Sequence, residues 1–331
     1  MTTPRMPPAD VAVIVVNYGT ADLALRAVGS VLARGHGGRR VEVHLVDNAS
    51  PGGDAARLAA AHAAAGWGDR VTLYPETVNH GFGRANNLVL AALAARGAAP
   101  ELVFLLNPDA CLKTEAIAEL AAFLEAHPGA AAVGAGIDAP GGGPAVTSAF
   151  RFPSPVSEFA GAARFGPLDR LTARWAVPLP PGPATRQVGW VAGAAVMLRR
   201  RALAEAGGFD PGFFLYFEEV ELMHRLRRAG WSIWYHPAAR VEHVAGAATG
   251  LRSGEERPRR LPAYWFDSWR LYFTRTRGRA GALACGLACL AGAHLHLLLS
   301  RLRGRPPAHP QGFAGDFARL ALRPLLRGER R

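Results

Sequence analysis

Residues 11–18 read Val-Ala-Val-Ile-Val-Val-Asn-Tyr, an unbroken apolar and mostly β-branched run that ends in asparagine. A half-exposed strand alternates apolar and polar residues, whereas a strand covered on both faces is apolar throughout. The stretch from Val11 to Val16 therefore predicts a strand buried on both faces, of the kind found at the centre of a parallel sheet.

Segments of strand and helix character alternate after this strand, with short connections. The predicted strands are Val41–Val46, Val71–Tyr74, Leu102–Leu106 and Ala131–Ile137, and the predicted helices are Ala21–Arg34, Asp54–Ala65, Gly83–Arg96 and Thr114–His127. This alternation is typical of a mostly parallel sheet with helices on both faces. The predicted fold class is therefore α/β.

The alternation breaks at residue 138. Residues 138–186 are rich in Gly and Pro and too long for an ordinary connection, which indicates a functional insertion or lid. Regular structure is expected again at Gln187–Leu198, then in a helix from Arg199 and in a strand at Ser232–Tyr235.

Length and composition limit the possible classes of protein. The 331 residues suggest one large domain, or one domain with an appendage. The net charge is +12, and because Lys113 is the only lysine, this charge comes from arginine, which favours anionic partners. The three cysteines form neither a disulfide framework nor a zinc spacing, and the polar stretch Met1–Asp10 has no signal-peptide pattern, so we expect a cytosolic protein.

The C-terminal part points to a membrane surface. Residues 281–299 are the most hydrophobic segment and have arginines on both sides. The segment is barely long enough to span a bilayer, and it leaves three possibilities open: a span, an interfacial helix, or a helix packed on the main domain. The tail, residues 319–331, has arginines among leucines, as basic amphipathic surface helices do.

Polar side chains follow the predicted strands, at Asn17, Asp47, Asn107 and Asp109. In parallel sheets ligands bind outside the carboxyl ends of the strands. The carboxylate of Asp47 could accept a hydrogen bond from the ring N–H of a pyrimidine base. The alternative is that it only caps the turn that follows its own strand. Asp109 suits a divalent cation that bridges two phosphates, or caps the next helix.

Two further segments are compatible with phosphate and metal binding. The loop Gly81-Phe82-Gly83-Arg84 opens a helix whose free N–H groups suit phosphate, although it completes neither a dinucleotide-binding motif nor a P-loop. Arg84 either pairs with a phosphate or lies in solvent. His243 could add an imidazole to a cation held by Asp109, more naturally to Mn²⁺ than to Mg²⁺.

An acidic cluster follows an aromatic run at Phe213–Leu222 and opens a helix. Carboxylates beside apolar side chains are costly unless they face a cleft, a cation or a helix N-terminus. One interpretation is a catalytic base among Glu218, Glu219 and Glu221. The other is that these charges only favour the positive end of the helix, with Glu221 pairing with Arg225 one turn on.

These motifs together resemble the inverting nucleotide-sugar glycosyltransferases of family 2, which have the GT-A fold. The resemblance runs from Val11 to about Gly246 and rests on motifs in a fixed order: 13–18, 46–50, 79–87, 105–109, 190–195, 207–210, 216–222 and His243. The Asn-Pro-Asp variant at 107–109 is similar to bacterial rhamnosyltransferases that act on cell-wall or surface-polysaccharide precursors. The resemblance implies a catalytic domain at 1–250, with a donor half (1–137) and an acceptor half (138–250), and a basic helical region at 251–331.

The resemblance also implies site roles. Asn17, Asp47, Arg84, Asn86 and Asn107 would bind the nucleotide sugar, Asp109 and His243 would hold Mg²⁺ or Mn²⁺, and Glu219 would be the base with Glu218 beside it. The chain departs from the family at 218–221, where Glu-Glu-Val-Glu replaces the common Glu-Asp-x-Asp, so the base could be either Glu218 or Glu219.

The implied reaction is transfer of a sugar, L-rhamnose from dTDP-rhamnose, to a glycan or polyprenyl-linked glycolipid, by an enzyme peripheral on the cytoplasmic face of an anionic membrane. A UDP- or GDP-sugar donor is the alternative. A nucleotidyltransferase would need a basic loop after Val16, where the sequence has none nearby. A charge-driven binder of membranes or nucleic acid is disfavoured because the arginines crowd the C-terminal third, away from the polar strand ends, and no nucleic-acid partner is expected.

Overall fold

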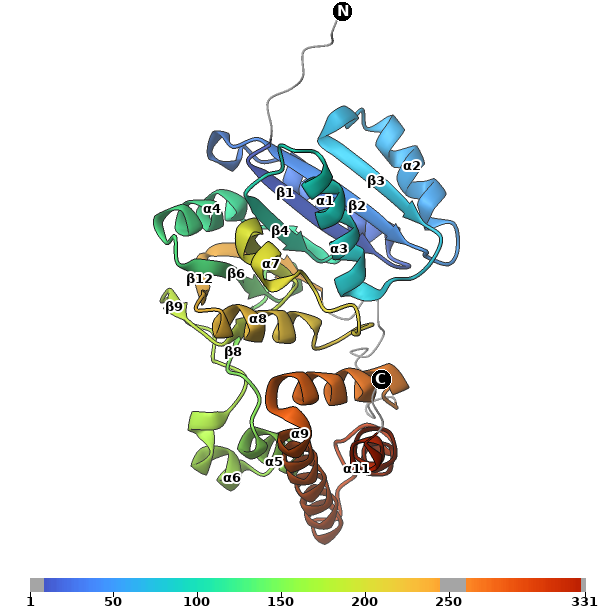
Figure 1. Cartoon of the computed structure of the whole chain (residues 1–331), viewed down its shortest axis with the longest axis vertical. Coiled ribbons are helices and arrows are strands. Elements are labelled where there is room, and N and C mark those ends of the chain that lie inside the picture. Colours follow the sequence, from blue (N-terminus) through green and yellow to red (C-terminus); the bar gives the residue numbers. More distant parts are fainter. Residues whose placement is uncertain (1–8, 245–259, 329–331) are drawn as a thin grey trace, which may run out of the picture.

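The computed structural model describes residues 9–244 and 260–328, which form an upper lobe built on a sheet and a lower helical lobe (Figure 1). The expected boundary between residues 250 and 251 lies outside the described residues. So do most of the Met1–Asp10 stretch and the last three residues of the basic tail.

The main sheet has the strand order β3-β2-β1-β4-β11-β6-β12-β5. These strands are β1 (Val11–Asn17), β2 (Val41–Asn48), β3 (Val71–Glu76), β4 (Leu102–Leu106), β5 (Ala110–Leu112), β6 (Ala130–Asp138), β11 (Ala195–Arg199) and β12 (Ser232–His243). The first four run parallel, and β11 enters antiparallel between β4 and β6. The predicted α/β fold with a mostly parallel sheet is confirmed, and β11 makes the sheet mixed.

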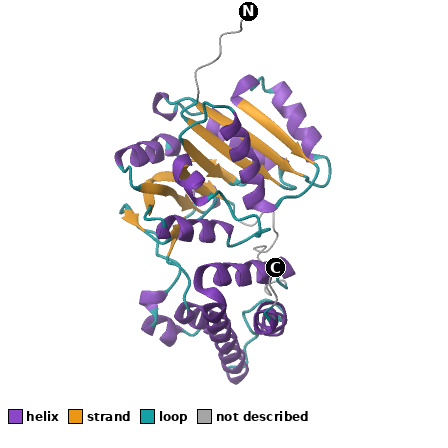
Figure 2. Cartoon of the chain, viewed as in Figure 1, coloured by secondary structure: helices purple, strands orange, loops and turns teal. Residues whose placement is uncertain are grey.

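Helices cover both faces of this sheet (Figure 2). They are α1 (Ala21–Leu32), α2 (Asp54–Ala64), α3 (Gly81–Ala95), α4 (Ala116–Ala126), α7 (Arg200–Ala206) and α8 (Glu218–Arg228). Alternate residues of β1 enter opposite cores: Val13 packs with α1 and α4, whereas Ile14 packs with α3, α7 and α8. This double burial is the physical reason that β1 is apolar throughout.

The helical lobe combines two separate stretches of chain. Its elements are α5 (Pro155–Ala163), α6 (Gly166–Leu171), α9 (Ala263–Leu302), α10 (Phe313–Asp316), a π-helical turn (Phe317–Leu322) and α11 (Arg323–Arg327). The helix α9 changes direction at Gly278, whose φ of 68° and ψ of 174° are not helical. Backbones of α5 and α9 touch, because a Cβ on Gly292 would lie 2.2 Å from the carbonyl oxygen of Phe159.

Several predicted boundaries differ from the structure. Residues 138–186 were expected to be a functional insertion or lid without regular structure, but they contain α5 and α6, and α5 packs against α9. The apolar segment 281–299 is only the second half of α9. The strand predicted at Ser232–Tyr235 continues to His243 past an irregularity at residues 236–240.

Short elements complete the description. The strands β7 (Ala145–Val146) and β9 (Arg186–Gln187) pair with β6 and β12, and β8 (Ala149–Phe150) pairs with β10 (Trp190–Val191). The region where regular structure was expected to resume, Gln187–Leu198, contains the end of β9, all of β10 and most of β11. Turns of 3₁₀ helix lie at His36–Gly38, Gly68–Arg70, Pro140–Gly142 and Ala173–Trp175.

Candidate active site

The carboxyl ends of β1 and β2 carry a buried polar network centred on Asn17. Its side-chain amide donates to Asp47 Oδ1 at 2.9 Å, to Ser50 Oγ at 3.1 Å and to Asp54 Oδ2 at 3.0 Å. Its Oδ1 accepts the backbone N–H of Thr20 at 3.2 Å. Because Asn17 is fully buried and bonded on both polar atoms, it orders the strand ends and holds the carboxylate of Asp47 in place.

The loop before α3 is shaped by two asparagines. Asn48 donates to Asn79 Oδ1 at 3.0 Å and to the carbonyl of Gly81 at 3.2 Å, and its own Oδ1 accepts the N–H of His80 at 2.9 Å. Arg84 donates through Nε to the carbonyl of His80 at 2.7 Å. These bonds fix the start of α3 beside the end of β2, and they anchor the Arg84 guanidinium there.

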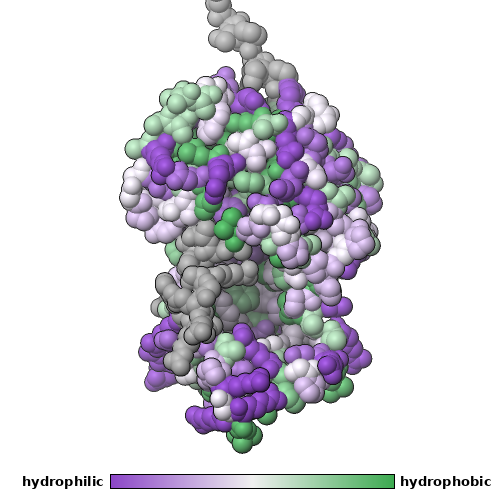
Figure 3. Space-filling model, turned by 180° about the vertical axis from the view of Figure 1, so that it is seen from behind, coloured by the Kyte–Doolittle hydropathy of each residue, from purple (hydrophilic) through white to green (hydrophobic). Residues whose placement is uncertain are grey.

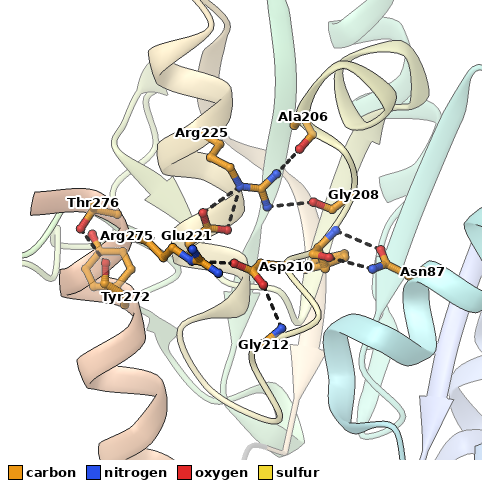
Figure 4. Close-up of polar contacts among 11 residues, drawn as sticks. Asn87, Ala206, Gly208, Asp210, Gly212, Glu221, Arg225, Tyr272, Arg275 and Thr276 are labelled. Atoms are coloured by element: carbon orange, nitrogen blue, oxygen red, sulfur yellow. Dashed lines mark hydrogen bonds and ion pairs between the residues drawn. The ribbon is translucent and has the colours of Figure 1, made fainter. Parts of the chain in front are cut away.

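Two neighbouring asparagines in α3 have different surroundings. Asn86 is fully buried and donates to the carbonyl of Phe82 at 2.9 Å, so its side chain lies inside the helix packing and does not reach the surface. Asn87 donates to the carbonyl of Phe209 at 2.8 Å and accepts that residue's N–H at 2.9 Å. Asn87 thereby joins α3 to the loop that leads to the acidic cluster (Figure 4).

The same loop is held from the other side by α8 and α9 (Figure 4). Arg225 forms an ion pair with Glu221 at 2.8 Å and donates to the carbonyls of Ala206 and Gly208. The predicted pairing of Glu221 with Arg225 is confirmed, so Glu221 is a structural carboxylate. Asp210 accepts from Arg275 of α9 at 3.1 Å, which ties the loop to the helical lobe.

The first turn of α8 presents Glu218 and Glu219. The chain enters this turn through Tyr216 and Phe217, whose φ values of 71° and 68° are left-handed and cost about 1–3 kcal/mol each for residues of this kind. Strain of this size persists where the surrounding contacts over-determine the backbone. Here Ser268 donates to the carbonyl of Leu215 at 2.9 Å, and the ring of Phe217 stacks on Tyr272.

The two carboxyls of this turn differ in their surroundings. Glu219 accepts the backbone N–H groups of Val220 and Gly193, whereas the Oε2 atom of Glu218 is buried and has no hydrogen-bond partner among the described residues. Burial raises the pKa of both groups, and the neighbouring charge of Glu219 raises the pKa of Glu218 further. Burial and the neighbouring charge therefore disfavour ionisation of Glu218 more than that of Glu219, whose carboxylate accepts backbone N–H groups.

Asn107, Asp109 and His243 converge at the ends of β4 and β12. His243 Nε2 lies 3.0 Å from Asp109 Oδ1 and 3.3 Å from Asn107 Nδ2, although 134 residues separate the histidine from the aspartate. The described residues contain no group of three or more His, Cys, Asp and Glu side chains able to hold a metal. The carboxylate of Asp109 and the imidazole of His243 could bind a divalent cation whose other ligands come from phosphate or water. This pair of ligands suits Mn²⁺.

This corner and Glu219 are connected through the backbone of residues 193–194. The N–H of Asn107 donates to the carbonyl of Ala194 at 2.9 Å, and the next residue back, Gly193, donates its N–H to Glu219. The carbonyl of Asp109 accepts the backbone N–H of Val244 at 3.0 Å. This bond fixes the end of β12 beside Asp109.

A cavity of about 650 Å³ opens at Glu219, between the two lobes. Figure 3 shows the molecule hollowed at this waist, with apolar side chains in the hollow. Its walls are mainly aromatic and apolar, and Trp190, Tyr216 and Trp265 are among them. Asp109 and His243 are not among its lining residues. Aromatic walls with a few polar groups are what a sugar-binding cavity requires, since sugar rings stack on aromatic faces.

Glu158 of α5 lies in the wall of the same cavity and joins the two stretches of the helical lobe. Its Oε2 accepts the indole N–H of Trp269 at 2.9 Å. Burial raises the pKa of Glu158 from 4.5 to about 7. The folded protein therefore binds a proton more tightly here than the unfolded chain does, so the stability that this group contributes is greatest below pH 4.5 and is lost as the pH rises towards 7.

Glu158→Gln is expected to remove this part of the pH dependence. The wild-type free energy of unfolding should fall by roughly 3 kcal/mol between pH 4.5 and 7 on account of this group, and the variant should lack that fall. Urea unfolding at pH 5 and pH 8 measures it, with the exposed Glu101→Gln as control. Equal pH dependence in wild type and Glu158→Gln would contradict the assignment.

The sequence interpretation missed the walls of the cavity and the role of Asn87. Trp265 lies outside the recognised motifs, and nothing in the periodicity of α9 distinguishes it from a core residue. Trp190 and Tyr216 were within quoted motifs, but as sequence landmarks only. Asn87 directly follows Asn86, and only the structure shows which of the two asparagines faces the loop at Phe209.

Comparisons with known proteins identify the family of this chain. The family model described as "Glycosyltransferase like family 2" matches residues 7–260. The N-acetylglucosaminyl-diphospho-decaprenol L-rhamnosyltransferase of Mycobacterium tuberculosis is 33% identical over 220 residues, 64% of this chain and 69% of that protein. The rhamnosyltransferase WbbL of Escherichia coli K12 is 38% identical over 58 residues, 18% of this chain and 22% of that protein.

Solved structures are similar in fold at low identity. GalNAc-T7 with UDP, GalNAc and Mn²⁺ superposes with a TM-score of 0.54 at 15% identity, covering 71% of this chain and 44% of that chain. TarS 1–349 of S. aureus superposes with a TM-score of 0.50 at 12% identity, covering 96% and 82% of the two chains. The expected GT-A architecture is confirmed. With a family model that matches most of its length, this chain belongs to glycosyltransferase family 2 and is a nucleotide-sugar glycosyltransferase.

Proposed function

We propose that this enzyme transfers a sugar with inversion from a nucleoside diphosphate to a hydroxyl of a lipid-linked or glycan acceptor. The observation that carries the proposal is the carboxylate of Glu219, held by two backbone amides at the end of an aromatic cavity. L-Rhamnose from dTDP-rhamnose is the favoured donor, because two relatives are named rhamnosyltransferases. A UDP- or GDP-sugar is the alternative.

The donor would occupy the strand ends. Asp47, held by Asn17, would accept the base N–H, and Arg84 at the start of α3 would face the diphosphate. Asp109 and His243, with Asn107 beside them, would hold Mn²⁺ or Mg²⁺, which supplies positive charge to the departing diphosphate. Asn86 lies within the helix packing, so it would support this site indirectly.

The acceptor would enter the cavity. Glu219 would take the proton of the acceptor hydroxyl as that oxygen attacks the anomeric carbon from the face opposite the diphosphate. The raised pKa of Glu218 disfavours a second negative charge beside the base. The walls of the cavity would orient the acceptor and exclude water, and such positioning lowers the barrier by several kcal/mol.

A membrane surface would present a polyprenyl-linked acceptor. Among the described residues, α9 is the one helix that length and composition would allow to cross a bilayer, and 39% of its apolar window is buried in the protein. Its outward side exposes Leu287, Leu298 and Leu302. We favour a peripheral position on the cytoplasmic face of an anionic membrane, because α5 and the π-helical turn already cover the other side of α9.

A thermal-shift panel tests the donor assignment. The panel contains dTDP, UDP, GDP, NAD and ATP, each with and without Mn²⁺ or Mg²⁺. With metal present dTDP should raise Tm most, a larger shift with UDP or GDP would favour the alternative donor, and NAD and ATP should give no shift. Asp109→Asn should abolish the metal-dependent part of the shift, because it removes the anionic oxygen ligand. A nucleotidyltransferase would instead release pyrophosphate from a nucleoside triphosphate, and a charge-driven binder would hold generic DNA with a steep loss of affinity in salt.

A further inference from the structure

A second hollow, of about 600 Å³, lies next to the acceptor cavity and is lined by three arginines. The arginines come from separate elements: Arg151 follows β8, Arg186 begins β9, and Arg227 lies in the last turn of α8. Gln187 and Leu179 complete much of the wall. We refer to this hollow as the arginine hollow.

The arginines of this hollow have no acidic partners among the described residues. None of the three forms an ion pair there, and their side chains donate to the backbone carbonyls of Ala176, Pro180 and Trp231. A hydrogen bond to a carbonyl uses one of the five N–H groups of a guanidinium and leaves its positive charge uncompensated. The Nε atom of Arg186 is buried with no hydrogen-bond partner among the described residues. A buried donor of this kind is costly unless a ligand or water meets it.

The two hollows share a wall. Residues 176–178 line the acceptor cavity, and Leu179, the next residue, lines the arginine hollow. Trp190 lines the acceptor cavity, and its indole N–H donates to the carbonyl of Arg151 at 3.0 Å. An anionic group attached to a molecule in the acceptor cavity therefore has a positively charged hollow beside it.

We propose that the arginine hollow is a binding site for phosphate or diphosphate groups. Guanidinium groups from three directions match the several oxygens of such an anion, and each can donate two parallel hydrogen bonds. The same chemistry has two sources: the diphosphate of a lipid-linked acceptor, or the headgroups of an anionic membrane. That the first source applies rests on the proposed function, whereas the anion site itself does not.

Calorimetric titration with inorganic pyrophosphate tests the site. The full chain is saturated with dTDP and Mg²⁺, so that the donor site does not compete for the probe. The double variant Arg151→Gln/Arg227→Gln should bind pyrophosphate at least about tenfold more weakly than wild type, since charged hydrogen bonds are lost. Arg186 is left intact, because its ring contact with Tyr235 contributes to folding.

Arg228→Gln is the matched control, on the same helix, exposed, and one residue beyond Arg227. It should bind pyrophosphate as wild type does. An equal loss in Arg228→Gln and in the double variant, or wild-type affinity in the double variant, overturns the site. This titration does not require sugar transfer, so failure of the proposed reaction leaves its result interpretable.

Two further measurements on the double variant identify the source. If the anion is the acceptor's diphosphate, KM for a lipid-linked acceptor rises at least about tenfold while KM for the donor and binding to phosphatidylglycerol vesicles stay unchanged. If headgroups are the source, vesicle binding falls and that KM changes only when the acceptor is presented in vesicles. Either result supports the site. If the double variant changes neither KM for the acceptor nor vesicle binding, the proposal is overturned.

Discussion

Glu219→Gln is expected to lower kcat for sugar transfer by about 100- to 10,000-fold, the range in which general bases contribute. Glutamine has the size of glutamate and can still meet the N–H groups of Gly193 and Val220 with its carbonyl oxygen, so the turn should remain folded. It cannot accept the proton of the acceptor hydroxyl. Binding of the nucleoside diphosphate, measured by calorimetry, should stay within about twofold, since the donor residues are untouched.

Glu218→Gln separates the two candidate bases. Burial and the adjacent charge raise the pKa of Glu218, so this substitution removes a carboxyl that is less readily ionised than Glu219. Its loss of kcat should therefore be far smaller than that of Glu219→Gln. If the two variants were equally inactive, or if Glu218→Gln alone were inactive, the assignment of the base to Glu219 would be wrong. Transfer at wild-type rate in both variants would exclude a base at this turn altogether.

The pH dependence follows from the same pair. Burial raises the pKa of Glu219, and the group acts as a base only when ionised, so the rate should rise with pH through the raised pKa. In Glu219→Gln this rising limb should disappear from the residual activity.

The sequence predicted the sheet lobe because its signals are local. The apolar run in β1 shows double burial directly, and polar residues at strand ends meet at one edge by topology alone. Asp109 and His243 are far apart in the chain, yet both could be assigned, because each directly ends a strand or follows one. The other site residues were predicted from the order of the motifs along the chain.

The acceptor side could not be predicted in this way. Its cavity depends on contacts such as Glu158 with Trp269, which lie 111 residues apart and belong to helices that have no site motif. Residues 138–186 looked irregular because Gly and Pro are frequent there, but α5 is stabilised by packing on α9 and by the Ser154 cap more than by its own helix propensity. Propensity alone therefore misses it.

Gly81→Ala is expected to destabilise the protein by about 4 kcal/mol or more, because two costs add. Gly81 has a φ of +72°, which L side chains rarely adopt, and a Cβ there would lie 1.8 Å from the carbonyl oxygen of Phe214. That oxygen also accepts the N–H of Phe82 at 3.2 Å, so it cannot move without breaking the contact between α3 and the loop before α8. Chemical unfolding measures the loss.

Gly97→Ala is the matched control, since Gly97 has a φ of +71° but open space around its Cβ position. It should cost only the backbone strain, about 1–2 kcal/mol, and should leave transfer unchanged. The difference between the two variants measures the contact at Phe214, which joins the donor loop at Gly81 to the turn that carries Glu219. If Gly81→Ala folds, kcat should fall, because moving Phe214 shifts the turn that presents the base. Equal stability of the two variants would mean that the donor loop and the base are held independently of each other.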